Sequence, residues 1–588
     1  MAAVVDRRQF MGYFAGIGLG STLFPGVLWA KISAGADITV ETIASAEEVA
    51  GITFDPAERE LMLDGLKQQE QRIEALHKVV LLNSVIPAIV FDPLPPGKKI
   101  ASEPRRPMVR GKVVHRALPA EDELAFLPVT ELSELVRRKR VTSVQLTQMY
   151  LARLKKYDPV LKCVISLTED RALKQAYAAD GDIRAGKYRG PLHGIPWGAK
   201  DLLAVRGYKT TWGAGPYKDQ VIDADATVVQ RLDAAGAVLV AKLTLGELAQ
   251  GDIWFGATTK NPWKVDQGSS GSSAGPASAT AAGLVGFAIG SETLGSISSP
   301  STRCGTTGLR PTFGRVPRTG AMALSWTMDK LGPICRSVED CAMVLDAIYG
   351  PDGQDNSVIP AGYHWNAQLS PKKLRVGYVK SAFDTPLTDP ADPKRTMHAT
   401  KPFDDAALDV FKRLGVNLIP VDLPDVPYDA MRIILTAEAA AAFDDLTRSN
   451  RDNELVQQGK FDWPNTFRTS RFIPAVDYVN ANRLRSVAIQ KWDDLMRTVD
   501  VIVTPTGAAN LSQLVATNLT GHPAVIIPNG FREDGTPVSI TFLGGLFEEP
   551  KMLAVARAYQ EATGFHLKHP IVPLTPPAPP PVAPRPEL

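Results

Sequence analysis

Two short segments rich in glycine and serine constrain the fold of this chain more than any other feature of its sequence. The first, residues 268–276, reads G-S-S-G-S-S-A-G-P, and the second, residues 290–297, reads G-S-E-T-L-G-S-I. Between them, residues 277–283 are rich in alanine and predict a helix, and the apolar run 284–289 predicts a strand. A plain linker would explain the glycine and serine content but not its placement at both ends of one helix–strand unit. We therefore expect two tight polar loops that return to one place and form a site.

The sequence around these loops predicts an α/β domain. Between residues 192 and 334, short apolar runs alternate with helical stretches, a pattern typical of α/β proteins. Residues 227–235 predict a helix, and residues 237–241 (A-V-L-V-A) predict a buried strand. Two further helices are expected to begin near Thr130 and Val144.

Charge and cysteine content exclude several classes of function. The 588 residues include 65 Lys plus Arg and 63 Asp plus Glu, so no basic excess is present to attract a phosphate backbone, and we expect no nucleic-acid partner. The four cysteines form no C-x-x-C pair, and no histidine stands at metal-ligand spacing from them. We therefore expect no metal, no cofactor, and buried free thiols.

The first 36 residues have the layout of an export signal. Arg7 and Arg8 precede an uncharged, glycine-rich stretch over residues 11–30, and residues 34–36 (A-G-A) form a small-x-small cleavage site. Paired arginines before such a stretch resemble a twin-arginine signal, which predicts a periplasmic or secreted protein. The alternative is a membrane anchor over residues 11–30, since twenty residues can just span a bilayer, but the glycines make this a poor span. We expect no stable membrane partner.

The remaining sequence divides around a catalytic domain. Residues 37–90 predict an accessory helical segment, in which apolar residues recur at near-helical spacing. Residues 91–126 are rich in proline and predict an extended linker over the surface. The catalytic domain is expected over residues 127–569, and the proline-rich tail 570–588 is expected to be a spacer or a wrapping arm.

One motif favours a different nucleophile. Residues 271–275 match G-x-S-x-G, which would make Ser273 the nucleophile of an α/β-hydrolase. That motif requires an apolar strand immediately before it, whereas residues 261–268 predict a loop. We therefore treat the match as a coincidence of Ser-Gly composition.

A series of ordered blocks is similar to the motifs of the amidase signature family. G-I-P-W-G-A-K-D (194–201) resembles its lysine block, T-K-N-P (259–262) its T-x-N-P turn, and residues 271–273 and 292–297 its two serine loops. Further matching blocks follow at 304–305, 308–312, 314–316, 332–333 and 521–524. The resemblance implies the amidase signature fold, with a mixed central sheet flanked by helices on both faces, and hydrolysis of a small-molecule amide.

Carried over residue by residue, the resemblance makes Ser296 the nucleophile, Ser272 the bridging serine and Lys200 the base. In the family the bridging serine follows a cis peptide bond. A serine hydroxyl is a weak nucleophile, so Lys200 must be neutral to accept its proton, and burial favours the neutral amine. The implied oxyanion donors are the backbone N–H groups of Thr293, Leu294, Gly295 and Ser296.

The nucleophile loop departs from the family pattern at three positions. Leu294 stands where the family often has glycine, and this side chain requires a negative φ or a rearranged loop. Glu292 replaces the more usual aspartate, and Ser298 replaces a common arginine. A buried pocket without a fixed cation would leave a substrate carboxylate unpaired, so we expect neutral, partly apolar amides to be preferred over glutamine.

Other functions compete with the amidase interpretation. The same family includes the glutamine-hydrolysing A subunit of a tRNA-dependent amidotransferase, but the export signal and Ser298 disfavour it. An esterase activity on the same residues and a homodimer stay open, whereas a catalytically dead binding protein is disfavoured by the intact Lys200, Ser272 and Ser296. Core packing explains the tryptophans near the motifs at least as well as a substrate wall does. These are Trp197, Trp212, Trp254 and Trp326.

Overall fold

The computed structural model describes residues 38–79, 81–113, 118–506 and 512–575. The expected export signal and most of the proline-rich tail lie outside these residues. Eleven strands form one mixed sheet in the order β1-β3-β2-β8-β10-β9-β14-β15-β13-β11-β12. Strands β3, β2 and β8 run parallel to one another, as do β12, β11 and β13, and the other neighbours pair antiparallel. The expected mixed sheet is confirmed.

The strands of this sheet are β1 (Val164–Leu167), β2 (Pro196–Lys200), β3 (Val238–Leu243), β8 (Phe287–Glu292), β9 (Thr307–Arg310), β10 (Lys330–Cys335), β11 (Val376–Val379), β12 (Leu418–Val421), β13 (Val501–Pro505), β14 (Ala524–Phe531) and β15 (Pro537–Gly544). Two small hairpins lie outside it, formed by β4 (Ile253–Trp254) with β5 (Ala257–Thr258) and by β6 (Lys260–Asn261) with β7 (Lys264–Gly268).

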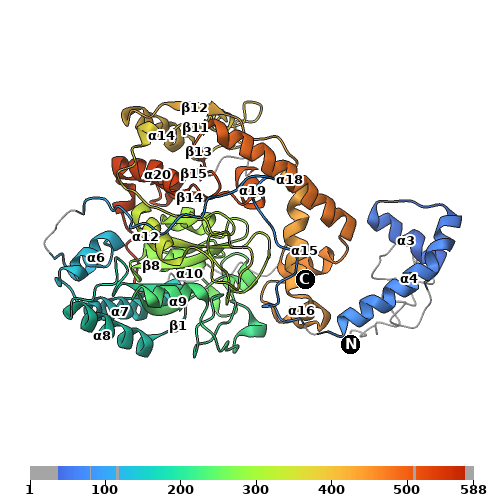
Figure 1. Cartoon of the computed structure of the whole chain (residues 1–588), viewed down its shortest axis with the longest axis horizontal. Helices are drawn as coiled ribbons and strands as arrows, with labels where there is room; N and C mark the ends of the chain where they lie inside the picture. Colours follow the sequence, from blue (N-terminus) through green and yellow to red (C-terminus); the bar gives the residue numbers. More distant parts are fainter. Residues whose placement is uncertain (1–37, 80, 114–117, 507–511, 576–588) are drawn as a thin grey trace, which may run out of the picture.

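The described residues form 18 α-helices, which cover the sheet on both sides. Helices α6 to α8 lie at one end of the body and α15 to α18 at the other (Figure 1). The helices are α3 (Val40–Ala50), α4 (Pro56–His77), α5 (Glu121–Leu124), α6 (Val129–Arg137), α7 (Ser143–Leu161), α8 (Glu169–Arg184), α9 (Thr227–Ala234), α10 (Ala274–Ala281), α11 (Ser298–Cys304), α12 (Val338–Ile348), α13 (Lys380–Asp384), α14 (Lys401–Arg413), α15 (Ile433–Ala442), α16 (Asp444–Arg448), α17 (Trp463–Ser470), α18 (Ala475–Thr498), α19 (Ser512–Thr520) and α20 (Glu549–Thr563).

The register of β2 against β8 brings the lysine block and the second serine loop to one edge of the sheet. Ala199 pairs with Ile289 in the parallel ladder, so Lys200, at the end of β2, lies beside the last residues of β8. Parallel strands that end together place their following loops at the same edge, where polar groups can converge. At Gly290 the backbone approaches the first serine loop closely, because a Cβ there would lie 2.8 Å from the hydroxyl of Ser273.

Two predicted boundaries near the site were wrong. The alanine-rich helix begins at Ala274 rather than at 277, and the strand expected over 284–289 is β8, Phe287–Glu292, so the second loop starts at Thr293. Residues 261–268 do not form a loop, because most of them belong to the β6–β7 hairpin. The polar composition of residues 261–268 gave no sign of this pairing. Backbone hydrogen bonds join the two strands of a hairpin whatever their side chains, and apolar and polar residues alternate along a strand only where one of its faces is buried in the core.

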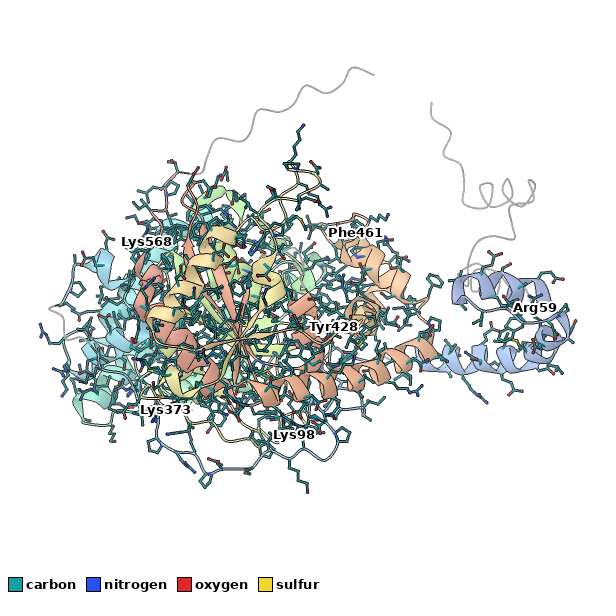
Figure 2. The ribbon with its side chains drawn as sticks, turned by 90° about the horizontal axis from the view of Figure 1, so that it is seen from above. Arg59, Lys98, Lys373, Tyr428, Phe461 and Lys568 are labelled. Atoms are coloured by element: carbon teal, nitrogen blue, oxygen red, sulfur yellow. The ribbon has the colours of Figure 1, made fainter. Side chains whose placement is uncertain are left out.

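The N-terminal extension begins with a helical hairpin that projects from the body. Arg59 of α4 donates two hydrogen bonds to Glu47 of α3, at 2.8 and 2.7 Å. Figure 2 shows this hairpin, marked by Arg59, reaching beyond the other helices. After α4 the chain returns to the body, where Arg448 of α16 donates a hydrogen bond to the carbonyl of His77.

Candidate active site

Lys200 lies at the centre of the site that the two serine loops form. Its side chain has no solvent exposure. Its Nζ lies 2.8 Å from the hydroxyl of Ser272, 3.1 Å from that of Ser273 and 2.9 Å from that of Ser291. Ser291 was not predicted as a site residue, and its place as the second residue of the G-S-E-T-L-G-S-I segment was the only signal for it.

Burial holds the pKa of Lys200 well below its usual value, although the more distant carboxylates of Asp329 and Glu292 oppose this shift. The adjacent Asp201 points to the other side of β2, where it lies 2.6 Å from Nζ of Lys242 and accepts hydrogen bonds from Thr211. Lys200 is left among hydroxyls, in surroundings that favour the neutral amine.

The two serine loops are bonded to each other through Ser273. Its N–H donates to the carbonyl of Ser296 at 3.0 Å, and its hydroxyl donates to the carbonyl of Ser291 while accepting from the N–H of the same residue. Ser273 is buried and its hydroxyl is engaged on every side. The segment before it belongs to a small hairpin and not to a strand of the main sheet. These features do not fit the exposed nucleophile of an α/β-hydrolase.

Ser272 and Ser296 lie on the two loops that meet at Lys200. The peptide bond between Gly271 and Ser272 is cis, as the resemblance implied. Within the described part of the chain, the hydroxyl of Ser296 makes no hydrogen bond, and 8% of the residue is exposed to solvent. The structure thus joins Lys200 and Ser272 by a hydrogen bond, whereas no hydrogen bond among the described residues joins the Ser296 hydroxyl to Ser272.

The turn before Ser296 exposes a row of backbone donors. Gly295 has a φ of +89°, a conformation that favours glycine, whereas Leu294 is not among the residues of positive φ. A side chain at Leu294 is therefore tolerated. No acceptor within the described residues bonds the four N–H groups of the predicted oxyanion loop. These groups belong to Thr293, Leu294, Gly295 and Ser296.

A buried carboxylate braces this loop from behind. Glu292 accepts hydrogen bonds at 2.8 Å from the N–H groups of Ile297 and Ser298 and from the Ser298 hydroxyl, and it also bonds Arg310 at 2.8 Å and Asn518 at 2.9 Å. Burial raises the pKa of Glu292, but the charge of Arg310 and the hydrogen bonds outweigh burial and hold it at about 2. Two departures from the family pattern, Glu292 and Ser298, therefore bond each other.

A cavity of about 700 Å³ opens beside the serine loops and reaches Ser291 and Thr293. Its wall includes Trp212 and Trp326, for which the sequence left core packing and a substrate wall both open, and residues 81–84 and 86 before the catalytic domain. Apolar periodicity in the sequence did not indicate that the tryptophans or the N-terminal residues line this cavity, because these residues come from distant parts of the chain.

The charged side chains of the described residues that line this cavity are carboxylates and one arginine, Arg318, which is paired with a carboxylate. Arg318 bonds Asp355 at 3.0 Å, the Trp326 carbonyl at 2.7 Å and the Ser357 hydroxyl at 2.8 Å. Asp329 accepts hydrogen bonds from Thr293 and from backbone N–H groups, although burial raises its pKa. No other Lys or Arg of the described residues lines this cavity.

Arg303 does not line this cavity. It bonds Gln267 at the surface and lines a separate cavity of about 290 Å³ beside α11. The four cysteines are buried free thiols. Within the described residues, no group of His, Cys, Asp and Glu could hold a metal ion, and no helix there has the length and apolar character needed to span a membrane.

Comparison with known proteins places this site in context. A model of the amidase family matches residues 145–553. The A subunit of glutamyl-tRNA(Gln) amidotransferase from Methylococcus capsulatus is 34% identical over 486 residues, which cover 75% of this chain and 98% of that protein. The protein of the same name from Acinetobacter baumannii is 32% identical over 494 residues, covering 76% and 98%. The structure of native peptide amidase from Stenotrophomonas maltophilia is similar with a TM-score of 0.64 at 31% identity, covering 74% of this chain and 97% of that one.

Proposed function

The chain belongs to the amidase family and is an enzyme that hydrolyses amide C–N bonds, and from this premise we propose that it cleaves neutral, partly apolar carboxylic amides through an acyl-Ser296 intermediate. In this proposal Ser296 is the nucleophile, Ser272 relays its proton and Lys200 is the base. The products are the carboxylic acid and ammonia or an amine.

The reaction proceeds in two halves. Neutral Lys200 takes the proton of Ser272 while Ser272 takes that of Ser296, and the Ser296 oxygen attacks the amide carbon. The N–H groups of residues 293–296 stabilise the oxyanion. The C–N bond breaks as the proton returns through Ser272 to the leaving nitrogen. Water then attacks the acyl ester, loses its proton along the same route, and releases the acid and the free Ser296 hydroxyl.

The observation that carries this proposal is the surroundings of Lys200. A neutral amine has two N–H donors and one lone pair, so three hydroxyl neighbours satisfy it. The Ser273 hydroxyl already donates to the Ser291 carbonyl and can only accept from Lys200. The amine can therefore donate to Ser273 and Ser291 and keep its lone pair for the proton of Ser272.

The cavity supports a neutral substrate. Among the described residues, the cavity is lined by one arginine, which is paired with Asp355, and by Asp329, Asp355 and Asp445. A substrate carboxylate would therefore meet like charges and no free cation in this part of the chain. The name of the similar peptide amidase adds amidated peptides as one class of neutral amide to test.

The second candidate is the A subunit of a glutamine-dependent amidotransferase, which the names of the similar proteins from M. capsulatus and A. baumannii favour. That function requires partner subunits in the cytoplasm and binding of free glutamine. The paired cation in the cavity and Ser298, whose hydroxyl is turned to Glu292, favour the hydrolase instead. We also propose that residues 1–36 export the enzyme to the periplasm or beyond.

The proposal is tested with Ser296→Ala, using Ser278→Ala as the matched control, because Ser278 is a buried serine of α10 whose hydroxyl donates to the Lys260 carbonyl and to no group of the serine loops in the described residues. Ser296→Ala should lose both turnover and labelling by a fluorophosphonate, and Ser278→Ala should keep both. Mapping the label to Ser273 would contradict the assignment. A kcat/KM for glutamine above that for an aryl or alkyl amide would favour the amidotransferase function.

A further inference from the structure

We propose that residues 81–86, here called the strap, form a specificity-determining wall of the substrate cavity and bind an apolar part of the amide substrate. This inference rests on the proposed function, because it assigns the cavity beside Ser291 and Thr293 to the substrate. The strap lies before residue 145, where the match to the amidase family begins. The strap is therefore outside the residues that the family model matches.

The strap reaches the cavity with most of its residues. Leu81, Leu82, Asn83, Ser84 and Ile86 line the same cavity as Thr293 of the oxyanion loop. The N–H of Val85 donates to the carbonyl of Leu82 at 2.9 Å, so the strap turns back on itself at this point. Val85 itself does not line the cavity.

Asn83 fixes the strap across the cavity wall. Its Nδ2 donates to the carbonyl of Ala323 at 2.8 Å and to that of Ala442 at 3.3 Å, and its Oδ1 accepts from the N–H of Ala323 at 2.8 Å. Ala323 and Ala442 also line the cavity, and they come from different parts of the catalytic domain. One amide side chain thus holds the strap to two sides of the cavity.

The apolar side chains of the strap are exposed although they line a cavity. Leu81 is 60% exposed, Leu82 66% and Ile86 48%. Apolar side chains grouped at a cavity gain free energy when an apolar ligand removes them from water, whereas they would gain nothing from a small polar amide. Trp212 and Trp326 line the same cavity and extend the apolar wall. The chemistry that fits is an amide with an alkyl or aryl chain.

The test measures how fast alkyl fluorophosphonates of increasing chain length label Ser296. In the wild type the rate should rise with chain length, by up to about three- to fourfold for each methylene that becomes buried. Leu82→Ala should flatten this increase, so that the ratio of the labelling rate for the longest compound to that for the methyl compound falls. Val85→Ala is the matched control, because Val85 lies in the same strap, is 51% exposed and does not line the cavity. It should keep the wild-type increase.

Asn83→Ala tests the attachment of the strap independently of the leucine contacts. Losing its three hydrogen bonds should also flatten the dependence of the labelling rate on chain length. Wild-type chain-length dependence in both Leu82→Ala and Asn83→Ala would overturn the strap assignment. Absence of Ser296 labelling by every probe in the wild type would instead contradict the proposed function, so the two failures are distinguishable.

Discussion

Replacing Glu292 with Gln should both destabilise the protein and slow the reaction. The substitution would keep the shape of the side chain but lose the negative charge opposite Arg310, a pair whose two side chains have no solvent exposure. Removing one partner of a buried ion pair costs about 3–5 kcal/mol. The pKa of Glu292, held at about 2 against a usual 4.5, corresponds to about 3 kcal/mol at about 1.4 kcal/mol for each pKa unit. Both routes give a similar loss of unfolding free energy.

The pH dependence follows from the same pKa. Because the folded-state pKa lies below the usual value, the stabilisation by Glu292 is present above about pH 4.5 and is lost as the pH falls toward 2. Urea unfolding at pH 7 should therefore show the full difference between the wild type and Glu292→Gln. That difference should shrink progressively below about pH 4.5.

Glu549→Gln is the matched control for the effect on rate. Glu549 is a buried carboxylate paired with Arg315 at 2.7 Å, and its hydrogen-bond partners lie on neither serine loop. Both variants should lose stability, but only Glu292→Gln should lower kcat of the folded enzyme, by about 10²-fold, because only Glu292 holds the N–H groups that follow Ser296. An unchanged unfolding free energy would refute the energetic reasoning, and an unchanged kcat would refute the positioning role.

Two further predictions concern the base and the export signal. Lys200→Met should lower kcat by about 10²- to 10⁴-fold and remove the fall in kcat/KM that we expect of the wild type as acidification protonates the amine. Lys330→Met, which removes another buried lysine of strongly lowered pKa, should keep that fall, and a wild-type rate that stays flat down to pH 4 would contradict a lysine base. Changing both Arg7 and Arg8 to Lys should retain the protein in the cytoplasm with its N-terminus uncut, as fractionation and N-terminal sequencing would show, whereas normal processing of the variant would argue against a twin-arginine signal.

Local patterns in the sequence predicted the fold class, and the resemblance of short blocks to the amidase signature family supplied the residues proposed to react. The alternation of apolar and helical runs predicted an α/β domain, and the mixed sheet is present. Lys200, Ser272 and Ser296 each stand in a short block whose residue types and order are visible without any tertiary contact.

What surrounds these residues was decided only by the tertiary structure. The brace on the nucleophile loop joins Glu292 to Asn518, and the strap brings Asn83 to Ala442, so each contact spans more than 200 residues of chain. Apolar periodicity reports which face of an element is buried, but not which distant element covers it. The neutral surroundings of Lys200, the braced loop and the apolar cavity wall therefore arise from packing between remote segments, and packing is a property of the folded chain and not of any local run of residues.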